Sequence, residues 1–130
     1  MKKIILALLI TLSSLSATLS VEYPSQKLLD SKIPIVDIRT PPEWKETGLL
    51  KGSIPIMFFN ENGGYDVNGF LAELNKKVDT TKPFALICRT ASRTKVVADF
   101  LSKQLHYDVI DLAGGIVFVQ MKRLPMTPYK

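Results

Sequence analysis

Short apolar runs alternate along this chain with segments of helical periodicity, and this alternation limits the fold more than any other feature. Runs rich in apolar, mostly β-branched or aromatic residues occupy 32–38, 54–59, 84–87 and 109–110. Between them, apolar residues recur every three or four positions in 66–78 and 92–105, which predicts two amphipathic helices. Strands that alternate with helices favour an α/β fold with a mostly parallel sheet.

Capping residues and turns predict the shorter elements. Ser25 is placed to cap a short helix that runs to Asp30, and Thr40, followed by two prolines, opens another helix that Gly48 ends. Glycine-containing turns are expected at 60–66 and 113–115, and a final short helix at 116–122. No internal repeat or linker interrupts this order, so 21–130 is expected to form one domain.

The first twenty residues differ from the rest of the chain. A basic head, Lys2-Lys3, precedes a nearly continuous apolar run at 4–12, and small hydroxylic residues follow. These are the three parts of a secretory signal peptide, which predicts a signal at 1–20 with cleavage between Ser16 and Ser20. An uncleaved membrane anchor or a buried N-terminal helix is the alternative, although the apolar run is shorter than the roughly 20 residues that span a bilayer.

Export to a bacterial periplasm follows from the signal as an expectation. Without Lys2 and Lys3 the remaining chain carries 15 basic and 12 acidic residues, a net charge of +3. This mild charge shows no basic stripe with interleaved aromatic residues, so a nucleic-acid partner is not expected. After cleavage no membrane span is expected either.

Cys88 is the only cysteine, so no internal disulfide can form, and a lone thiol in an oxidising compartment is exposed to oxidation. His106 is the only histidine. One cysteine and one histidine do not make a zinc site, and the sequence predicts neither a metal nor a cofactor. His106 lies between a helix and a strand and is expected to be an exposed loop residue.

The position of Cys88 suggests that it is there to react. It follows a buried strand and precedes a helix, at the edge of the sheet where α/β proteins bind ligands. Unpaired N–H groups at a helix start and nearby cations favour a thiolate. Arg89 and Arg93 are the expected cations, and Ser92 and Thr94 the expected capping or donor hydroxyls. The alternative is a small buried cysteine at a strand end.

Four segments in order give the chain a resemblance to the rhodanese family of sulfurtransferase domains. The first, 35–44, is an apolar strand ending in Asp37-Ile38-Arg39 and followed by Glu43-Trp44; the second is 48–54. The third is Cys88-Arg89-Thr90-Ala91-Ser92-Arg93-Thr94, and the fourth combines 112–116 with Leu124-Pro125. The resemblance implies a central, mostly parallel five-stranded sheet with helices on both faces.

The resemblance also implies a mechanism. Cys88 would be the nucleophile that takes a sulfane sulfur from a small anionic donor such as thiosulfate and holds it as a persulfide. Loop residues Arg89, Thr90, Ala91, Ser92, Arg93 and Thr94 would form the substrate-binding cradle. A thiophilic acceptor, namely cyanide, a thiol or a partner protein, would then remove the sulfur. Asp37, Arg39 and Glu43 are expected to be structural, with Arg39 paired to Glu43, and Trp44 is expected in the core.

Two other functions remain open at this point. One is a sulfur carrier or partner-binding module without appreciable turnover. The other is a phosphatase, but four residues separate Cys88 from Arg93, one fewer than in the related dual-specificity phosphatases. The chain also departs from the family where Ala91 replaces a common glycine, Leu49 a common histidine, Val119 a common tryptophan and Arg123 a common glycine. Ala91 predicts either a different turn or mild strain.

Overall fold

The computed structural model describes residues 17–130. The helices are α1 (Gln26–Asp30), α2 (Pro41–Thr47), α3 (Val67–Lys77), α4 (Ser92–Leu105) and α5 (Gly115–Met121). The strands are β1 (Leu19–Glu22), β2 (Ile35–Asp37), β3 (Leu49–Leu50), β4 (Ile54–Pro55), β5 (Phe84–Ile87), β6 (Val109–Leu112) and β7 (Met126–Thr127).

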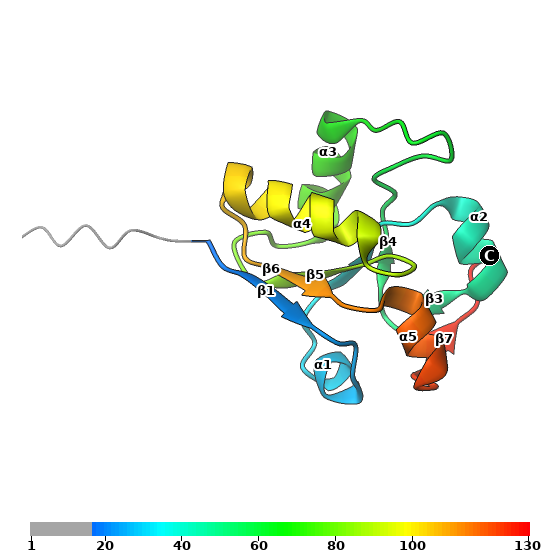
Figure 1. Ribbon diagram of the computed structural model, residues 1–130. Coiled ribbons are helices and arrows are strands. Elements are labelled where there is room, and N and C mark those ends of the chain that lie inside the picture. Colours follow the sequence, from blue (N-terminus) through cyan, green and yellow to red (C-terminus); the bar gives the residue numbers. More distant parts are fainter. Residues whose placement is uncertain (1–16) are drawn as a thin grey trace, which may run out of the picture.

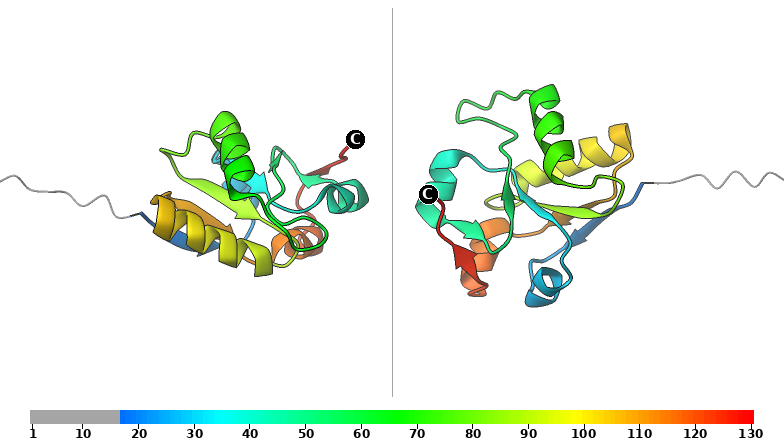
Figure 2. Two further views of the ribbon diagram at one scale, coloured as in Figure 1. Left: turned by 90° about the horizontal axis from the view of Figure 1, so that it is seen from above. Right: turned by 180° about the vertical axis from the view of Figure 1, so that it is seen from behind.

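Five parallel strands form the central sheet in the order β1-β6-β5-β2-β4, and β3 and β7 form a small antiparallel pair (Figure 1). The predicted α/β class, the five-stranded parallel sheet and the helices on both faces are confirmed. Figures 1 and 2 show α3 and α4 on one side of the sheet and α1 and α5 on the other. No helix of residues 17–130 is long and apolar enough to cross a membrane.

Alternation along β5 divides the core into two layers. Phe84 and Leu86 pack with α3 and α4, whereas Ala85 and Ile87 pack with α1 and α5. Because successive side chains of a strand point to opposite faces, the next residue, Cys88, belongs to the layer of Phe84 and Leu86. β5 is thus buried on both faces, as parallel strands are, and it delivers Cys88 to the carboxyl end of the sheet.

Most predicted helix boundaries agree with the structure. Ser25 accepts the Leu28 N–H at the start of α1, Thr40 forms a capping box with Glu43 in α2, Gly48 ends that helix, and Asp66 caps α3. Of the two roles expected of Ser92 and Thr94, capping is not observed, because Ala91 is the N-cap of α4 and offers no side-chain bond. Thr94 lies fully buried in the first turn, and its hydroxyl is a donor.

The second predicted strand, 54–59, is shorter than expected because regular strand geometry ends at Pro55. Beyond it the chain still bonds to its neighbour, since Ile56 N donates to Asp37 O at 3.0 Å and Phe58 N donates to Ile38 O at 3.2 Å. The end of the segment turns to other partners, since Phe59 forms an isolated antiparallel bridge with Tyr65 instead of extending the parallel sheet.

β1 was not anticipated. The predicted signal lies outside the described residues as far as position 16, but Leu19 and Ser20, its last two residues, pair with Val109 and Ile110. All four residues of β1 are exposed, which hides the strand from a search for buried apolar runs. A cut after Ser20 would remove half of β1, whereas a cut before Thr18 would leave it whole.

Candidate active site

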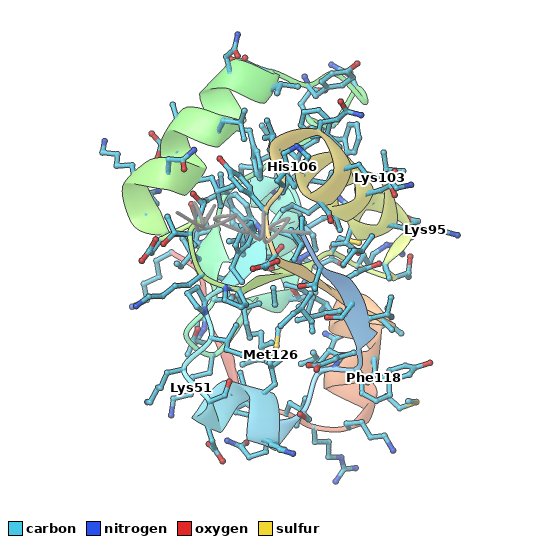
Figure 3. The ribbon with its side chains drawn as sticks, turned by 90° about the vertical axis from the view of Figure 1, so that its left-hand side faces the viewer. Lys51, Lys95, Lys103, His106, Phe118 and Met126 are labelled. Atoms are coloured by element: carbon cyan, nitrogen blue, oxygen red, sulfur yellow. The ribbon has the colours of Figure 1, made fainter. Side chains whose placement is uncertain are left out.

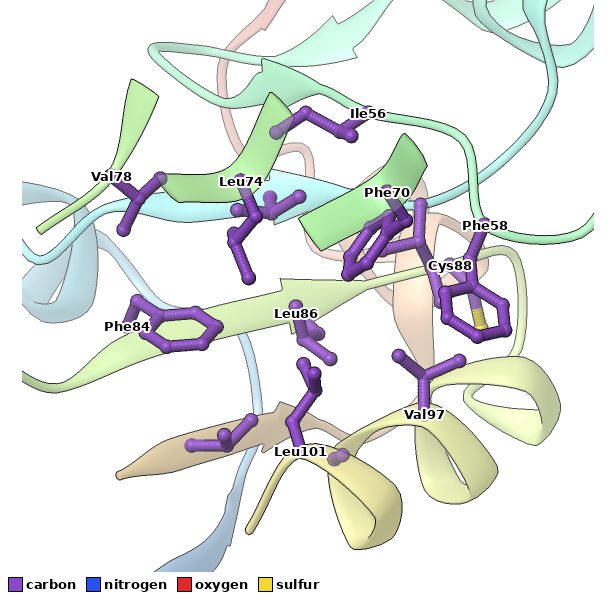
Figure 4. Close-up of a cluster of buried hydrophobic side chains, with 14 residues drawn as sticks. Ile56, Phe58, Phe70, Leu74, Val78, Phe84, Leu86, Cys88, Val97 and Leu101 are labelled. Atoms are coloured by element: carbon purple, nitrogen blue, oxygen red, sulfur yellow. The ribbon is translucent and has the colours of Figure 1, made fainter. Parts of the chain in front are cut away.

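Cys88 lies directly after the central strand β5, and the loop that follows leads into the start of α4. β2 and β6 flank β5, so the loop opens at the carboxyl edge of the sheet. The Cys88 side chain is fully buried and lies close to Phe58 and Val97 (Figure 4). The only thiol of the chain therefore sits at the base of the loop rather than on its surface.

Helix α5 is hydrogen-bonded to the backbone of this loop. Ile116 N donates to Cys88 O at 2.9 Å, and Val117 N donates to Arg89 O at 3.1 Å. These bonds use N–H groups from the first turn of α5, which have no partner within the helix. With both carbonyls turned toward α5, the loop can present N–H groups on its other side. Ala91 N does so and donates to Cys88 Sγ at 3.2 Å.

Gly115 makes this close approach feasible. It has a φ of +57°, and a Cβ at this position would lie 2.4 Å from Cys88 O and 2.5 Å from Arg89 O. Two requirements thus coincide at one residue: a backbone conformation that favours glycine and space for only a hydrogen atom. Gly115, the second glycine of the pair in the fourth sequence segment, thus serves the cysteine loop directly.

Ala91 adopts a φ of +78°, in the left-handed region that favours glycine. Of the two outcomes predicted for this residue, a different turn or mild strain, the structure shows strain. Replacing Ala91 by glycine is expected to raise the free energy of unfolding by up to about 1 kcal/mol, because glycine adopts this conformation without a Cβ penalty. Urea denaturation measures the change. Ala98→Gly, a matched substitution in the interior of α4, is expected to lower the free energy of unfolding instead; a loss of stability in both variants would contradict strain at Ala91.

Thr94 connects the cysteine to an acid on β6. Its hydroxyl lies 3.7 Å from Cys88 Sγ and 2.6 Å from Asp111 Oδ1. Asp111 is 7% exposed and Thr94 is fully buried. Asp111 was missed at the level of sequence, although an acidic residue inside the apolar run of β6 is a signal that could have identified it.

The ion pairs at this edge differ from the one expected. Arg39 does not pair with Glu43; it pairs with Asp37 at 2.8 Å, and Glu43 instead takes both terminal nitrogens of Arg93, at 2.6 and 2.8 Å. The physical reason is that Asp37, Arg39 and the starts of α2 and α4 all meet at the carboxyl edge of the sheet. Arg93 reaches Glu43 across 50 positions of sequence.

The Asp37–Arg39 pair lies inside the protein. Asp37 is fully buried and Arg39 is 1% exposed, and Trp44 Nε1 donates to Asp37 Oδ1 at 3.1 Å. Arg39 also donates to Gly48 O and to Thr47 Oγ1, each at 2.9 Å. These bonds join β2 to the middle and the C-terminal end of α2, which gives the pair a structural position beneath the site.

Glu43 is electrostatically coupled to Arg93. The hydrogen bond from Arg93 is the largest cause that lowers the pKa of Glu43 from 4.5 to about 2, and Glu43 in turn raises the pKa of Arg93. The positive charge of Arg93, which was expected to bind the donor, is therefore largely offset. Arg89 is exposed and forms no ion pair among the described residues, so it is the loop cation open to solvent.

This coupling predicts an acid-sensitive stability. A carboxylate with a lowered pKa stabilises the fold above its unfolded value of about 4.5, and this contribution disappears as the pH falls toward about 2. Glu43→Gln is expected to flatten the decline in unfolding free energy over this range, measured by urea denaturation at several pH values. Glu46→Gln, on the exposed side of the same helix, is the control. Equal acid sensitivity in wild type and Glu43→Gln would contradict the assignment.

The remaining loop residues have separate positions. Thr90 and Ser92 are exposed beside Arg89, whereas Thr94 is inside. A cavity of about 220 Å³ lies next to the loop and is lined in part by Arg89, Arg39, Glu43 and Val117. His106 is exposed at the far end of α4, as predicted (Figure 3). No cluster of three or more potential metal ligands occurs within residues 17–130.

A protein-family model matches most of this chain. The family model described as rhodanese-like domain matches residues 21–122. An uncharacterized protein of Rickettsia prowazekii, strain Madrid E, is 27% identical over 92 residues, which cover 68% of this chain and 72% of that protein.

Solved structures share the fold. A rhodanese-related protein from Thermoplasma volcanium superposes with a TM-score of 0.57 at 24% identity and covers 79% of this chain and 91% of its own. Rv0390 from M. tuberculosis gives a TM-score of 0.60 at 16% identity and covers 75% and 80% of the two chains. With the family model spanning the sheet, the cysteine loop and α5, this chain belongs to the rhodanese-like domain family.

Proposed function

We propose that this protein is a sulfurtransferase that moves sulfane sulfur from an anionic donor such as thiosulfate to a thiophilic acceptor through a Cys88 persulfide. Deprotonated Cys88 attacks the outer sulfur of thiosulfate, a new S–S bond forms, and sulfite leaves with the electron pair of the old one. An acceptor thiolate or cyanide then attacks the outer sulfur of the persulfide, and Cys88 leaves as a thiolate.

The observation that carries this proposal is the Ala91 N–H that donates to Cys88 Sγ at 3.2 Å inside a loop held by α5. A preorganised N–H group stabilises negative charge on sulfur without rearrangement during the reaction. Arg89, exposed at the rim, supports the binding of a small anion. No metal or cofactor takes part in the proposed chemistry.

Steady-state assays test the proposal. The purified protein is given thiosulfate or 3-mercaptopyruvate as donor and cyanide as acceptor, and thiocyanate is measured. We expect turnover in the wild type and none in Cys88→Ser, which keeps a residue of similar size but lacks the nucleophilic sulfur. Absence of Cys88-dependent thiocyanate with every sulfane donor would contradict the enzyme assignment.

Burial of Cys88 favours a second candidate, a sulfur carrier that serves a partner protein. The thiol is fully buried and Arg93 is occupied by Glu43, which leaves less exposed positive charge for a free donor than the loop sequence suggests. A carrier would accept one sulfur per Cys88 and release it quickly only to its partner. Stoichiometric loading without steady-state turnover distinguishes this candidate from the enzyme.

The proposed site of action is outside the cytoplasm, in a bacterial periplasm. The basic head and apolar run at the start of the sequence support it. Fractionation of cells that express the full chain, followed by N-terminal sequencing, tests the proposal. A full-length product confined to the cytoplasm would contradict it.

A further inference from the structure

Two cavities of unlike chemistry flank the cysteine loop. The first, lined in part by Arg89 and Glu43, lies toward α2 and α5 and is polar. The second has a volume of about 320 Å³ and lies between α4 and the segment 58–67. All of its lining residues are apolar or aromatic: Phe58, Phe59, Tyr65, Val67, Val96, Val97 and Phe100. The proposed reaction assigns no role to this second cavity, termed the apolar cavity below.

A well-bonded turn builds one wall of the apolar cavity. Phe59 and Tyr65 form an isolated antiparallel bridge at the base of this turn. Asn60 closes it, because its N–H donates to Gly64 O at 2.8 Å and its Oδ1 accepts the Gly64 N–H at 2.9 Å. The ring of Phe58 lies 4.8 Å from that of Phe59 and 5.8 Å from that of Tyr65, centroid to centroid. The wall is therefore preorganised, which lowers the cost of ordering it around a ligand.

The apolar cavity adjoins the proposed nucleophile. Phe58 and Val97 line it, and the same two side chains lie beside Cys88 (Figure 4). On α4, Val96 follows Ser92 by four residues, so it lies one turn away from the cysteine loop on the same helix face. One helical turn rises about 5.4 Å. A molecule that places an apolar group in the cavity therefore reaches the loop with a chain only a few bonds long.

The size and the mouth of the apolar cavity suit a small apolar group. Tyr65 is 65% exposed and Val96 is 60% exposed, so both would lose apolar surface to water-free contact when the cavity is filled. The volume of about 320 Å³ is near the lower end of the range for ligand pockets, which begins at about 300 Å³. One aromatic ring or a short aliphatic chain fits this description.

The lining distinguishes between the two reactants of the proposed transfer. An anionic donor such as thiosulfate loses its charged part as sulfite, and burying an oxyanion among side chains without a cation is unfavourable. The Tyr65 hydroxyl is the single polar side-chain group of the lining, whereas Arg89 faces the polar cavity. An acceptor thiolate carries its charge on the sulfur that attacks inside the loop, and the rest of the molecule is free to be apolar. The apolar cavity thus matches the acceptor.

We propose that the apolar cavity binds the apolar group of a small organic thiol that serves as the sulfur acceptor. This inference rests on the Cys88 persulfide of the proposed function. The acceptor thiolate attacks the outer sulfur of the persulfide and forms a new S–S bond. The S–S bond to Cys88 breaks, and Cys88 leaves as a thiolate with its electron pair. The product is an organic persulfide, which takes its apolar group out of the cavity when it dissociates.

Two thiols of similar acidity test the proposal, benzyl mercaptan and 2-mercaptoethanol, which lacks the apolar group. Protein loaded with one sulfur from thiosulfate and freed of donor is mixed with either thiol, and quenched samples are weighed by mass spectrometry. We expect the second-order rate constant for unloading to be about tenfold larger with benzyl mercaptan, because burial of roughly 60 Å² of apolar surface suffices for this factor.

Variants at exposed positions assign the preference to the apolar cavity. Val96→Asn and Tyr65→Ser each make the lining more polar without altering the core, and each is expected to reduce the ratio of the two rate constants to less than about threefold. Val21→Asn is the matched control, because Val21 is a 66% exposed valine on β1 and lies outside the cavity. Its ratio is expected to equal that of the wild type.

Alkylation of unloaded Cys88 provides a second measurement that needs no sulfur transfer. N-benzyl iodoacetamide is compared with iodoacetamide, each relative to its rate with N-acetylcysteine, and we expect a several-fold preference for the benzyl reagent that Val96→Asn removes. Ratios near one in both assays, or equal changes in Val96→Asn and Val21→Asn, would overturn the proposal and fit a cavity covered by a partner protein or a second copy of this chain. Failure to load sulfur would contradict the proposed function, while the alkylation ratio still tests the cavity.

Discussion

Gly115→Ala is expected to reduce sulfur transfer by about 100-fold or more and to lower the free energy of unfolding by about 3 kcal/mol. The added methyl group would lie 2.4 Å from Cys88 O and 2.5 Å from Arg89 O, closer than atoms approach without a shift. Both carbonyls are bonded to α5, so the loop must move and take the Ala91 N–H away from the sulfur. Urea denaturation and the thiocyanate assay measure the two effects.

Gly52→Ala separates backbone strain from the clash. Gly52 has a φ of +79°, but nothing lies within 4 Å of the position that an added Cβ would take. Its replacement is expected to cost about 1 kcal/mol and to leave turnover unchanged. Wild-type turnover in Gly115→Ala would refute the role of α5 in shaping the cysteine loop. A loss of turnover in Gly52→Ala as large as that in Gly115→Ala would refute it as well.

Asp37→Ala is expected to produce the largest loss of stability, about 3–5 kcal/mol. Asp37 and Arg39 form an ion pair that is almost fully inaccessible to solvent. Removing the acid leaves the Arg39 guanidinium buried without its counter-charge and frees the Trp44 N–H from its acceptor. Chemical denaturation reports the change through the midpoint and slope of the transition.

Asp99→Ala is the matched control for that prediction. Asp99 pairs with Lys103 at 2.8 Å on the outer face of α4, where both side chains are about half exposed or more. An exposed helical pair of this kind contributes only about 0.3–0.5 kcal/mol. Comparable losses in Asp37→Ala and Asp99→Ala would contradict the view that the buried pair anchors β2 and α2.

The sequence was sufficient to predict the elements that rest on local patterns. Local apolar runs predicted the strands β2, β5 and β6. Helical periodicity of apolar residues predicted α3 and α4. The position of Cys88 between strand and helix likewise followed from residues 84–93. β1 could not be recognised in this way, because its residues are exposed and overlap the predicted signal.

Contacts between distant segments account for what the sequence could not show. Arg39 and Arg93 were both available to Glu43, and the choice depends on how α2 and α4 meet at the sheet edge. The support of the loop by α5 joins Cys88 to Ile116 across the sheet edge, which no local pattern encodes. Asp111 was the exception: an acid within an apolar strand was visible, but its link to Cys88 through Thr94 was not.

The intact mass of the protein after exposure to thiosulfate and removal of free donor tests the central claim most directly. The proposed function predicts a gain of one sulfur atom per chain, lost on addition of cyanide or dithiothreitol and absent in Cys88→Ser. An unchanged mass with thiosulfate and with 3-mercaptopyruvate, in protein whose Cys88 is still open to alkylation, would contradict a Cys88 persulfide.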